Sequence, residues 1–450
     1  MTDEILLHKK VPLSGNYDVV VAGGGPAGFT AAISAARAGL RTALVEKLSF
    51  FGGTATAGYV VPISGFFHQG RRVIGGIAWE FVERLQAMNA AQVELPKGHV
   101  SFHVESYKLL CERMLVQEGV ALYTNACLTD CIIADDRITH IVFEGPSGAE
   151  ALSARCFIDA TGDAVLCRKA GVPMQSADEL QPMSLCFLLE GVDVTTPLLR
   201  DSIHHDGKNG RGSCQQEIHA YLASCMAEGR LSQFGGPWFN SLVQGNAIAV
   251  NITRRAGNAA DRAERTRTEL LLREDMFAIV ALLREKYPEF KHCSIAASGV
   301  GAGVRETQRI AGIGCMTLES MLLEIEPECA VSRCAHPMDI HSATSQSQQL
   351  TPLAHAPGIP HTTLIPQKFS NLLVAGRCLS ADSHAYASLR VQATLMATGE
   401  AAGVMAALAC EKDCAFAKLD AAKLQSMLKK RSLLPVTEQK SEKNLRDITG

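Results

Sequence analysis

The stretch 19-VVVAGGGPAGFTAA-32 decides the fold of this chain. Its first residues, Val19–Ala22, are apolar and predict a buried parallel strand, and the small residues of Pro26–Ala38 predict a helix packed closely on that strand. Three consecutive glycines join the two elements. A strand, a glycine turn and a helix in this order predict a parallel α/β architecture at the start of the chain.

The glycines follow the spacing Gly23-x-Gly25-x-x-Gly28. In such a turn the first glycine permits the tight bend, the second lets backbone N–H groups approach a pyrophosphate, and the third lets helix and strand pack closely. A second predicted strand, Thr42–Val45, ends in Glu46, whose carboxylate can accept hydrogen bonds from ribose hydroxyls and disfavours a 2′-phosphate. The pattern predicts a dinucleotide site, and the alternative is a purely structural turn.

The bulk composition is that of a globular α/β chain. Its 450 residues favour two closely connected domains over one. A net charge of −3 without basic runs argues against nucleic acid or an anionic membrane surface as partner. No segment reaches about 18 uninterrupted apolar residues, so we expect no membrane span. The first residues lack the apolar core of a signal peptide, so we expect a cytoplasmic location.

The cysteines do not form a metal or disulfide pattern. There are 15 of them, an odd number, spread along the chain without any C-x-x-C pair. This distribution favours buried, reduced thiols and predicts neither a metal nor an iron–sulfur site. The redox cysteine pair of pyridine-nucleotide disulfide reductases is also absent, because Gly52 to Phe102 contains no cysteine.

The pattern of elements changes twice along the chain. The segments MSLCFLLEGVD and NAIAVNITRR predict antiparallel strands, and a long helix after them ends near Pro288. A buried strand, Leu372–Ala375, then returns to the α/β pattern, before a long helix of small residues. Further helices and strands are predicted at Gly76–Asn89, Ser106–Glu118, Ala121–Tyr123, Cys127–Ala134, Ile138–Glu144 and Arg155–Asp159.

We therefore predict an α/β protein with a Rossmann-like dinucleotide-binding domain, built on a parallel central sheet and split by an inserted α+β substrate domain. The dinucleotide-binding domain takes residues 1–172 and 356–412, and the substrate domain takes 173–355. Residues 413–450 form a C-terminal helix and tail.

A second turn has the same character as the first. The strand Arg155–Asp159 runs into Ala160-Thr161-Gly162-Asp163 and a new helix. Small residues and an acid at this position suggest a backbone that approaches a ligand, although an ordinary strand-to-helix turn would produce the same pattern.

Several motifs occur in a fixed order and resemble a known family. The glycine motif with Glu46 is followed by FGGTAT, IDATGDA, GVRETQRIAG, PMDIH and NLLVAGRCLSADSHAYASLRV…GEAAG. Together they resemble the FAD-dependent oxidoreductases of glutathione-reductase-like fold, whose architectural relatives include the succinate dehydrogenase and fumarate reductase flavoproteins. The resemblance covers residues 17 to about 410 and implies FAD as cofactor, but it does not specify a substrate.

The resemblance also implies which residues hold FAD. Those implied at the pyrophosphate, the adenosine and the flavin edge are Gly23, Gly25, Pro26, Ala27, Gly28, Glu46, Lys47, Gly52, Gly53, Thr54, Cys127 and Leu128. Those implied to close over the cofactor and approach its ribityl chain and flavin ring are Ala160, Thr161, Gly162, Asp163, Gly376, Arg377, Arg390, Val391 and Gln392.

The helix expected to start near Val391 has a physical reason to face the flavin. Its free N–H groups and dipole would stabilise the negative charge of a reduced flavin ring. The chain departs from the family at Ala22, where isoleucine or glycine is usual, and at Glu400, where glutamine is usual. Glu400 could slightly alter the electrostatics of the flavin.

Arginines in GVRETQRIAG are the first catalytic candidates. Arg305, Glu306 and Arg309 stand at helical spacing, and an arginine facing the substrate would clamp a carboxylate. The alternative is that Arg305 and Glu306 make structural ion pairs between the two domains.

Histidines in two further motifs are candidates for proton transfer and substrate contact. Asp339 and His341 share a face if PMDIH is extended, and His341 would accept a proton with a pKa near the working pH. A hydrogen-bonded interface histidine is the alternative. We also expect His384 and Arg390 to contact substrate from a loop spanning Ser380 to Gln392.

These residues predict an FAD-dependent dehydrogenase or oxidase that transfers a hydride between flavin N5 and a small polar, carboxylate-bearing metabolite while a histidine takes the proton. No second dinucleotide motif follows, so the electron acceptor would be oxygen, a quinone or a partner protein. The alternatives are a C=C reductase, a monooxygenase, or the flavin subunit of an electron-transfer complex. A homo-oligomer is possible.

Overall fold

The computed structural model describes residues 5, 7–95, 98–175, 177, 179–199, 213–323, 326–431 and 433. The described helices are α1 (Pro26–Arg37), α2 (Gly76–Ala87), α3 (Val104–Gln117), α4 (Val165–Lys169), α6 (Ser213–Ala227), α7 (Arg262–Lys286), α8 (Leu318–Leu322), α9 (Ser383–Leu389), α10 (Gln392–Lys412) and α11 (Ala421–Lys430). The strands up to β10 are β1 (Leu13–Ala22), β2 (Thr42–Val45), β3 (Phe67–His68), β4 (Arg71–Arg72), β5 (Ala91–Glu94), β6 (His99–Phe102), β7 (Ala121–Tyr123), β8 (Cys127–Ala134), β9 (Arg137–Gly145) and β10 (Gly148–Asp159). The later strands are β11 (Met174–Gln175), β12 (Phe187–Glu190), β13 (Trp238–Ser241), β14 (Ile248–Asn251), β15 (Ser294–Ser298), β16 (Arg309–Ile310), β17 (Ala330–Arg333), β18 (Met338–His341), β19 (Gln348–Thr351), β20 (Gly358–Pro360) and β21 (Leu372–Val374).

A seven-stranded sheet forms the centre of the molecule, with the order β7-β2-β1-β10-β9-β8 and with β21 beside the end of β10. The pairs β7–β2, β2–β1, β1–β10 and β10–β21 are parallel, whereas β9 and β8 continue the sheet through antiparallel pairs. The predicted α/β fold is confirmed, but the sheet is mixed because β8, β9 and β10 follow one another through tight turns. Since Leu372 pairs with Phe157, the chain returns to the first sheet after a long excursion.

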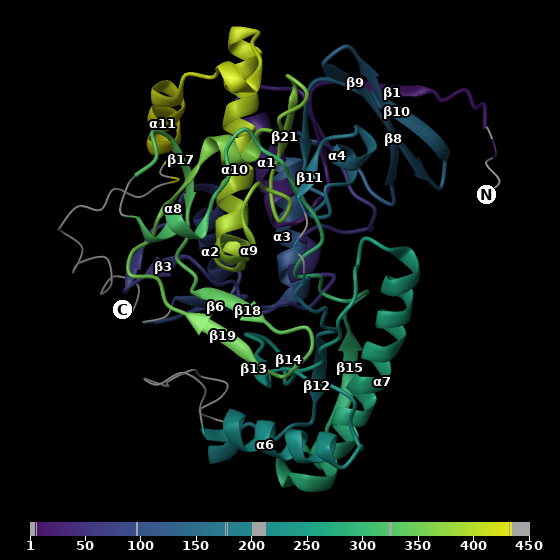
Figure 1. The fold of residues 1–450 in the computed structure, drawn as a ribbon, viewed down its shortest axis with the longest axis vertical. Coiled ribbons are helices and arrows are strands. Elements are labelled where there is room, and N and C mark those ends of the chain that lie inside the picture. The colour runs from purple at the N-terminus through teal and green to yellow at the C-terminus, as the bar shows by residue number, and fades with distance from the viewer. Residues whose placement is uncertain are drawn as a thin grey trace.

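Two helices pack against each other on this sheet. The hydroxyl of Thr30 donates to the carbonyl of Met396 at 2.8 Å, and the hydroxyl of Ser34 donates to the carbonyl of Glu400 at 2.7 Å. Because both pairs have the same offset in sequence, α1 and α10 run parallel and begin at the same level. Figure 1 shows α10 lying along α1 in the upper half of the molecule.

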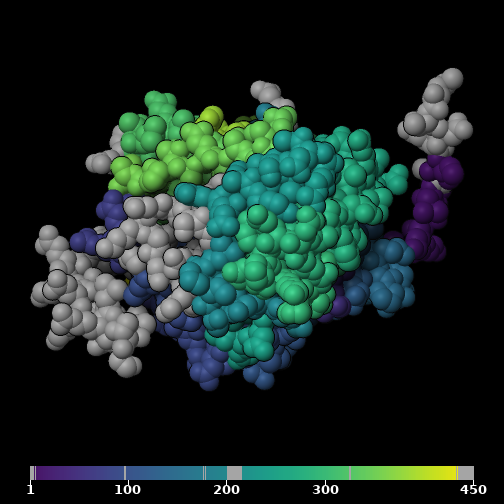
Figure 2. Space-filling model, turned by 90° about the horizontal axis from the view of Figure 1, so that it is seen from below, coloured from purple at the N-terminus to yellow at the C-terminus, as the bar shows by residue number. Residues whose placement is uncertain are grey.

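A second, smaller sheet has its own hydrophobic core. Its order is β13-β14-β12-β15, with antiparallel pairs throughout. Its inner side chains pack with α6 and α7 in a core that runs along the chain from Met183 to Val304. We call residues 183–304 the cap. Figure 1 places the cap below the central sheet, and Figure 2, seen from below, shows it in teal across the middle of the molecule.

Most predicted elements lie where the sequence places them, and two do not. The segment Ser380 to Gln392 is not a loop throughout, because it contains α9, whose first turn is capped by the carboxylate of Asp382. Arg305 and Arg309 are not at helical spacing either, because the chain between them is irregular and Arg309 opens the short strand β16.

The hydrophobic core of the cap covers less of the chain than the predicted substrate domain. The core of the cap ends at Val304, whereas Ile310, Met316 and Val331 pack in the core of the central sheet. The predicted C-terminal helix is present as α11, and residues 434–450 of the predicted tail lie outside the described residues.

Of the described helices, α10 is long and apolar enough to cross a membrane, but 94% of its apolar window is buried inside the protein, as in the core helix of a folded domain.

Candidate functional site

The turn after β1 leaves no room for side chains at two of its glycines. Gly23 has a φ of +98°, and a Cβ there would lie 2.5 Å from the carbonyl oxygen of Ala160. A Cβ on Gly28 would overlap the carbonyl oxygen of Gly23. The turn is therefore pressed between α1 and the end of β10, so glycine is needed at both positions.

The start of α1 is open by comparison. Gly25 is the N-cap residue, without a side-chain cap, and a Cβ there would meet only the Cα of Gly53, at 3.8 Å. Among the described residues, the backbone N–H groups of Ala27 and Gly28 have no acceptor. Pro26 has no N–H group, and the loop Gly52–Thr54 passes beside the turn. This opening presents donors and a positive helix end to an anion.

Glu46 lies next to the same turn. Its buried carboxylate accepts the N–H of Gly24 through Oε2 at 2.6 Å and the N–H of Leu48 through Oε1 at 2.9 Å. Each oxygen keeps a second lone pair for a hydroxyl. The carbonyl of Glu46 accepts the N–H of Ala126, which brings Cys127 and Leu128 to this edge, while the side chain of Lys47 is exposed.

The second turn is built around Asp159. Its Oδ1 accepts the N–H and the hydroxyl of Thr161, and its Oδ2 accepts the N–H of Cys167 at 2.9 Å. Burial raises the pKa of Asp159. This carboxyl therefore shapes the turn, and Asp163, which follows it, accepts hydrogen bonds from Thr307 and Arg377.

Arg377 joins this turn to the C-terminal part of the chain. Its Nη2 donates to Oδ1 of Asp163 at 2.9 Å, whereas its Nη1 is buried and has no partner among the described residues. Gly376 has a φ of +96°, and a Cβ there would lie 3.4 Å from the Cβ of Ala27. The backbone just before Arg377 therefore lies near the start of α1.

The start of α10 has a second orphaned polar atom. Nε2 of Gln392 donates to the carbonyl of Val60 at 2.8 Å, and its Oε1 is buried without a partner among the described residues. Val391 is the N-cap of α10 and has no side-chain cap. The N-terminal ends of α1 and α10 thus begin at one level, and both carry unsatisfied polar groups.

A cavity of about 1160 Å³ extends from this region to the cap. Residues from both sides line it, including Thr54, Arg377, Val391 and Gln392. The charged and titratable residues that line it are Arg305, Arg377, Arg390, Asp339, Cys186, His68, His99, His219, His336 and His341. Since α6 and the cap sheet contribute to its wall, the cavity joins the two halves of the protein.

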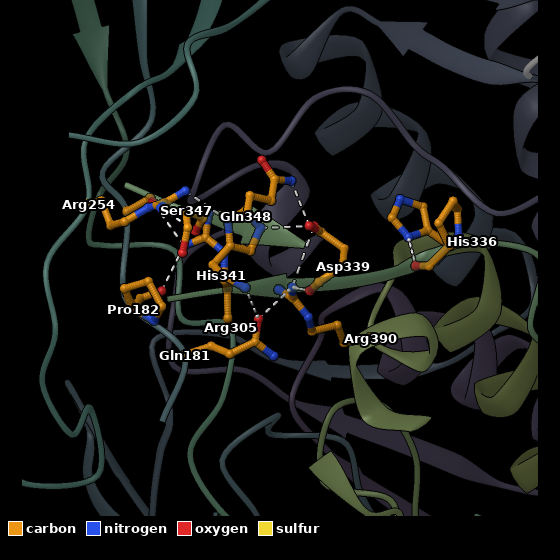
Figure 3. A network of polar contacts seen from close by, with 12 residues as sticks. Gln181, Pro182, Arg254, Arg305, His336, Asp339, His341, Ser347, Gln348 and Arg390 are labelled. Carbon is orange, nitrogen blue, oxygen red and sulfur yellow. Dashed lines mark hydrogen bonds and ion pairs between the residues drawn. The ribbon is translucent and has the colours of Figure 1, made fainter. Parts of the chain in front are cut away.

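His341 is hydrogen-bonded through both ring nitrogens (Figure 3). Its Nδ1 lies 3.0 Å from Nη2 of Arg254, which can only donate, so Nδ1 accepts and Nε2–H donates to Oδ2 of Asp339 at 2.9 Å. Burial and the charge of Arg305 lower the pKa of His341 to about 3. The expectation of a pKa near the working pH is therefore wrong, because this ring is held neutral with both nitrogens in use.

Asp339 is the acceptor at the centre of this group. Its Oδ1 accepts from Nε2 of Gln348 at 2.6 Å, and Oδ2 lies 3.6 Å from Nη2 of Arg390. Burial would raise the pKa of Asp339, but the hydrogen bond from His341 and the charge of Arg390 outweigh it and hold the pKa well below its usual value. Asp339 is therefore an anion at neutral pH.

Arg305 and Arg390 are each held by hydrogen bonds from one nitrogen of the guanidinium group. Nη1 of Arg305 donates to the carbonyl of Pro182 at 2.7 Å and to the hydroxyl of Ser184 at 2.8 Å. Nη2 of Arg390 donates to Oε1 of Gln181 at 3.0 Å and to the carbonyl of Asp339 at 2.7 Å, and its Nε is buried without a partner among the described residues.

Arg305 and Arg390 carry two positive charges, and the carboxylate of Asp339 beside them supplies one negative charge. Burial and the positive charge of Arg390 lower the pKa of Arg305 to about 9, so Arg305 is still a cation at neutral pH. Of the structural ion pairs expected as the alternative, Glu306 forms one with Arg309, whereas Arg305 donates to the neutral groups of Pro182 and Ser184.

His384 does not lie with these residues. Its side chain is exposed on α9, and it does not line the cavity. The predicted contact of His384 with substrate is therefore not supported by its position, because α9 replaces the expected loop and turns this side chain outward.

Sequence reasoning missed several residues of the cavity. Arg254 contacts His341 from the cap, and His336, His219 and Trp238 line the wall. The two adjacent arginines of NITRR, Arg254 and Arg255, were a weak signal for a site residue, since arginine interrupts an apolar strand pattern. No local pattern pairs it with a histidine 87 positions later.

The glycine turn, Glu46 and the open helix starts define a dinucleotide-binding α/β protein. The orphaned atoms of Arg377 and Gln392 fit a bound group with acceptor and donor atoms along the line between α1 and α10. A family model described as FAD dependent oxidoreductase matches residues 18–428, and the chain belongs to this family. The protein is thus an FAD-dependent oxidoreductase that uses FAD as its cofactor.

Curated relatives match only parts of the chain. The thiamine thiazole synthase of Methanothermobacter thermautotrophicus is 33% identical over 175 residues, which are 36% of this chain and 64% of that protein. The digeranylgeranylglycerophospholipid reductase 2 of Methanopyrus kandleri is 30% identical over 186 residues, which are 40% of this chain and 46% of that protein. The matches thus span less than two thirds of the length of these relatives.

A solved structure of similar extent is a geranylgeranyl bacteriochlorophyll reductase-like protein from Thermoplasma acidophilum. It has a TM-score of 0.47 and 14% sequence identity, and the similarity covers 93% of this chain and 84% of that chain. The family, and no single relative, is therefore what the comparisons establish.

Proposed function

We propose that this oxidoreductase is a dehydrogenase or oxidase of a carboxylate-bearing substrate, held by Arg305 and Arg390. The observation that carries the proposal is the charge balance of the cavity. The partly buried guanidinium groups of Arg305 and Arg390 face it, and among the described residues that line it Asp339 is the carboxylate beside them, with both oxygens already engaged. Arg377 is paired with Asp163 and does not change this balance. A substrate carboxylate would supply the missing negative charge.

When bound, FAD would accept a hydride at its N5 atom, and electrons would pass on to oxygen, a quinone or a partner protein. The residues of the chain would hold the substrate and take its proton. His341 is unsuited to take the proton because both of its ring nitrogens are hydrogen-bonded. We assign the proton to another histidine of the same cavity.

His336 is that histidine. Its Nδ1 lies 2.8 Å from the carbonyl of Pro337, which can only accept, so the proton of the neutral ring is on Nδ1 and the lone pair is on Nε2. Nε2 has no partner among the described residues, and the half-buried ring lines the cavity. Burial lowers the pKa of His336, which keeps Nε2 available as an acceptor at neutral pH.

The test is anaerobic reduction of the FAD-loaded protein by small 2-hydroxy and 2-amino acids, each beside its methyl ester. We expect the visible flavin absorbance to bleach with an acid and not with its ester, because the ester lacks the negative charge. Bleaching by acid and ester at equal rates would overturn the carboxylate assignment. A flavin that only dithionite reduces would favour the reductase, monooxygenase or electron-transfer alternatives.

A further inference from the structure

One row of the cap sheet forms a wall of the cavity. In the register of β13 and β14, Trp238 pairs with Asn251, and the pairing of Phe187 with Val250 places Cys186 beside Asn251 on the other side. Trp238, Asn251 and Cys186 all line the cavity. Side chains alternate between the faces of a strand. The neighbouring row, Phe239, Val250 and Phe187, therefore packs into the core of the cap instead.

The two ends of this row have different chemistry. Cys186 lies two residues after Ser184, whose hydroxyl accepts from Arg305, so this end adjoins the proposed carboxylate site. Neighbouring strands are about 4.8 Å apart, so Trp238, two strands away, stands about 10 Å from that end. A carboxylate with a body of only two or three carbons does not span this distance.

Apolar side chains from outside the cap line the same cavity. Phe67 comes from β3. Leu350, which is 49% exposed although it is a large apolar residue, comes from β19 and lies opposite Asp339. These two residues, like Trp238, lie on elements apart from the glycine turn and the starts of α1 and α10.

We infer that the substrate is an amphipathic carboxylate, whose acid group lies at Arg305 and Arg390 and whose apolar body extends about 10 Å to Trp238. This inference rests on the proposed carboxylate site, and it replaces the expected small polar metabolite with a larger, mostly apolar one. Trp238 then determines specificity for the apolar body, whereas the arginines hold the charged group.

The test uses three probes with the FAD-loaded protein: acetate, 4-phenylbutyrate and the neutral 4-phenylbutanol. Binding is followed by perturbation of the flavin absorbance and by tryptophan fluorescence. The sequence has 2 tryptophans, so Trp79→Phe leaves Trp238 as the only one. We expect 4-phenylbutyrate to bind at least 100-fold more tightly than acetate and to change the fluorescence of Trp238. We expect 4-phenylbutanol to bind at least tenfold more weakly than 4-phenylbutyrate.

Variants separate this inference from the carboxylate proposal. Trp238→Ala should weaken 4-phenylbutyrate binding at least tenfold and leave acetate binding unchanged. Leu350→Ala is the control at the charged end, because Leu350 pairs with Asp339 and is half exposed, and it should leave the ratio of the two affinities unchanged. Equal affinity for acetate and 4-phenylbutyrate, or equal losses for both in Trp238→Ala, would overturn the inference and leave the carboxylate site standing. Equal affinity for 4-phenylbutyrate and 4-phenylbutanol would overturn the carboxylate proposal itself.

Discussion

Nε2 of His341 lies 2.9 Å from Oδ2 of Asp339, on the same face of β18. With Arg254 on the other ring nitrogen, this pair forms a chain from the cap to the carboxylate beside Arg390 (Figure 3). The histidine is thus a positioning residue, because it orients Asp339 and Arg254 and has no nitrogen left for a substrate.

The buried neutral state of His341 predicts a pH-dependent stability. Its folded pKa of about 3 lies below the usual value of 6.5, so the unfolded chain binds more protons between these values and the protein loses stability as the pH falls through them. From pH 6.5 to 5 this loss is about 2 kcal/mol. In His341→Asn the loss is absent, so the difference in the free energy of unfolding between wild type and variant changes over this window. Urea unfolding at several pH values measures it, and a constant difference would contradict the assignment.

Glu400 predicts the opposite dependence. Its buried carboxyl accepts the N–H of Ile77 at 2.7 Å at the start of α2, away from the main cavity, and burial raises its pKa to about 7. The folded state binds more protons than the unfolded state between pH 4.5 and 7, so stability falls as the pH rises through this range.

Glu400→Gln should therefore raise the free energy of unfolding at pH 8 by about 1–3 kcal/mol and change it little at pH 5. Denaturant unfolding at both pH values is the measurement. A change of equal size at both would show that packing, and not protonation, governs this position.

The glycine turn predicts two separable effects. Gly25→Ala places a methyl group in the open cleft at 3.8 Å from the nearest atom, so the apoprotein should keep its stability while FAD binds at least tenfold more weakly. Gly28→Ala should instead destabilise the apoprotein, because its Cβ overlaps the carbonyl of Gly23. Thermal unfolding and FAD titration of both variants test this, and unchanged FAD affinity in Gly25→Ala would argue against a pyrophosphate at the turn.

Arg305 predicts a loss of binding without a loss of stability. Arg305→Met should weaken the binding of acetate at least tenfold and leave the apoprotein as stable as before or more stable, because an incompletely balanced buried charge is removed. Isothermal titration and thermal unfolding test both parts. A strong destabilisation with unchanged acetate affinity would mean that Arg305 is a structural residue.

His336 predicts a kinetic effect. His336→Asn keeps a donor for the carbonyl of Pro337 but has no equivalent of Nε2, so anaerobic flavin reduction by an acid substrate should slow at least 100-fold while acetate binding stays the same. His384→Asn is the matched control on the exposed face of α9, and in this variant the acid substrate should reduce the flavin at the wild-type rate. Equal rates for both variants would remove His336 as the proton acceptor.

The local sequence was enough to predict the dinucleotide-binding part of the fold. The spacing of Gly23, Gly25 and Gly28 and the acid at Glu46 describe groups within one strand-turn-helix unit and the next strand, where chain geometry alone brings them together. The return of β21 could also be predicted, since a buried apolar strand needs a sheet to cover it.

The charged wall could not be predicted in the same way. His341 was selected for its proximity to Asp339, but its neutral state depends on Arg254 from the cap and on burial, neither of which has a local pattern. The polar motif around His384 predicted a loop. The structure has the helix α9 there instead, which begins after its capping residue Asp382 and turns His384 outward.

The sequence by itself therefore determined the position of the dinucleotide turn, because short-range backbone geometry makes it, and its ordered motifs carried the resemblance that implies the family and FAD. Only the tertiary structure decided which histidine keeps a free nitrogen, how the arginines are balanced, and how far Trp238 lies from them. These properties depend on desolvation and on distances between strands of different segments, and both arise only when the cap closes over the central sheet.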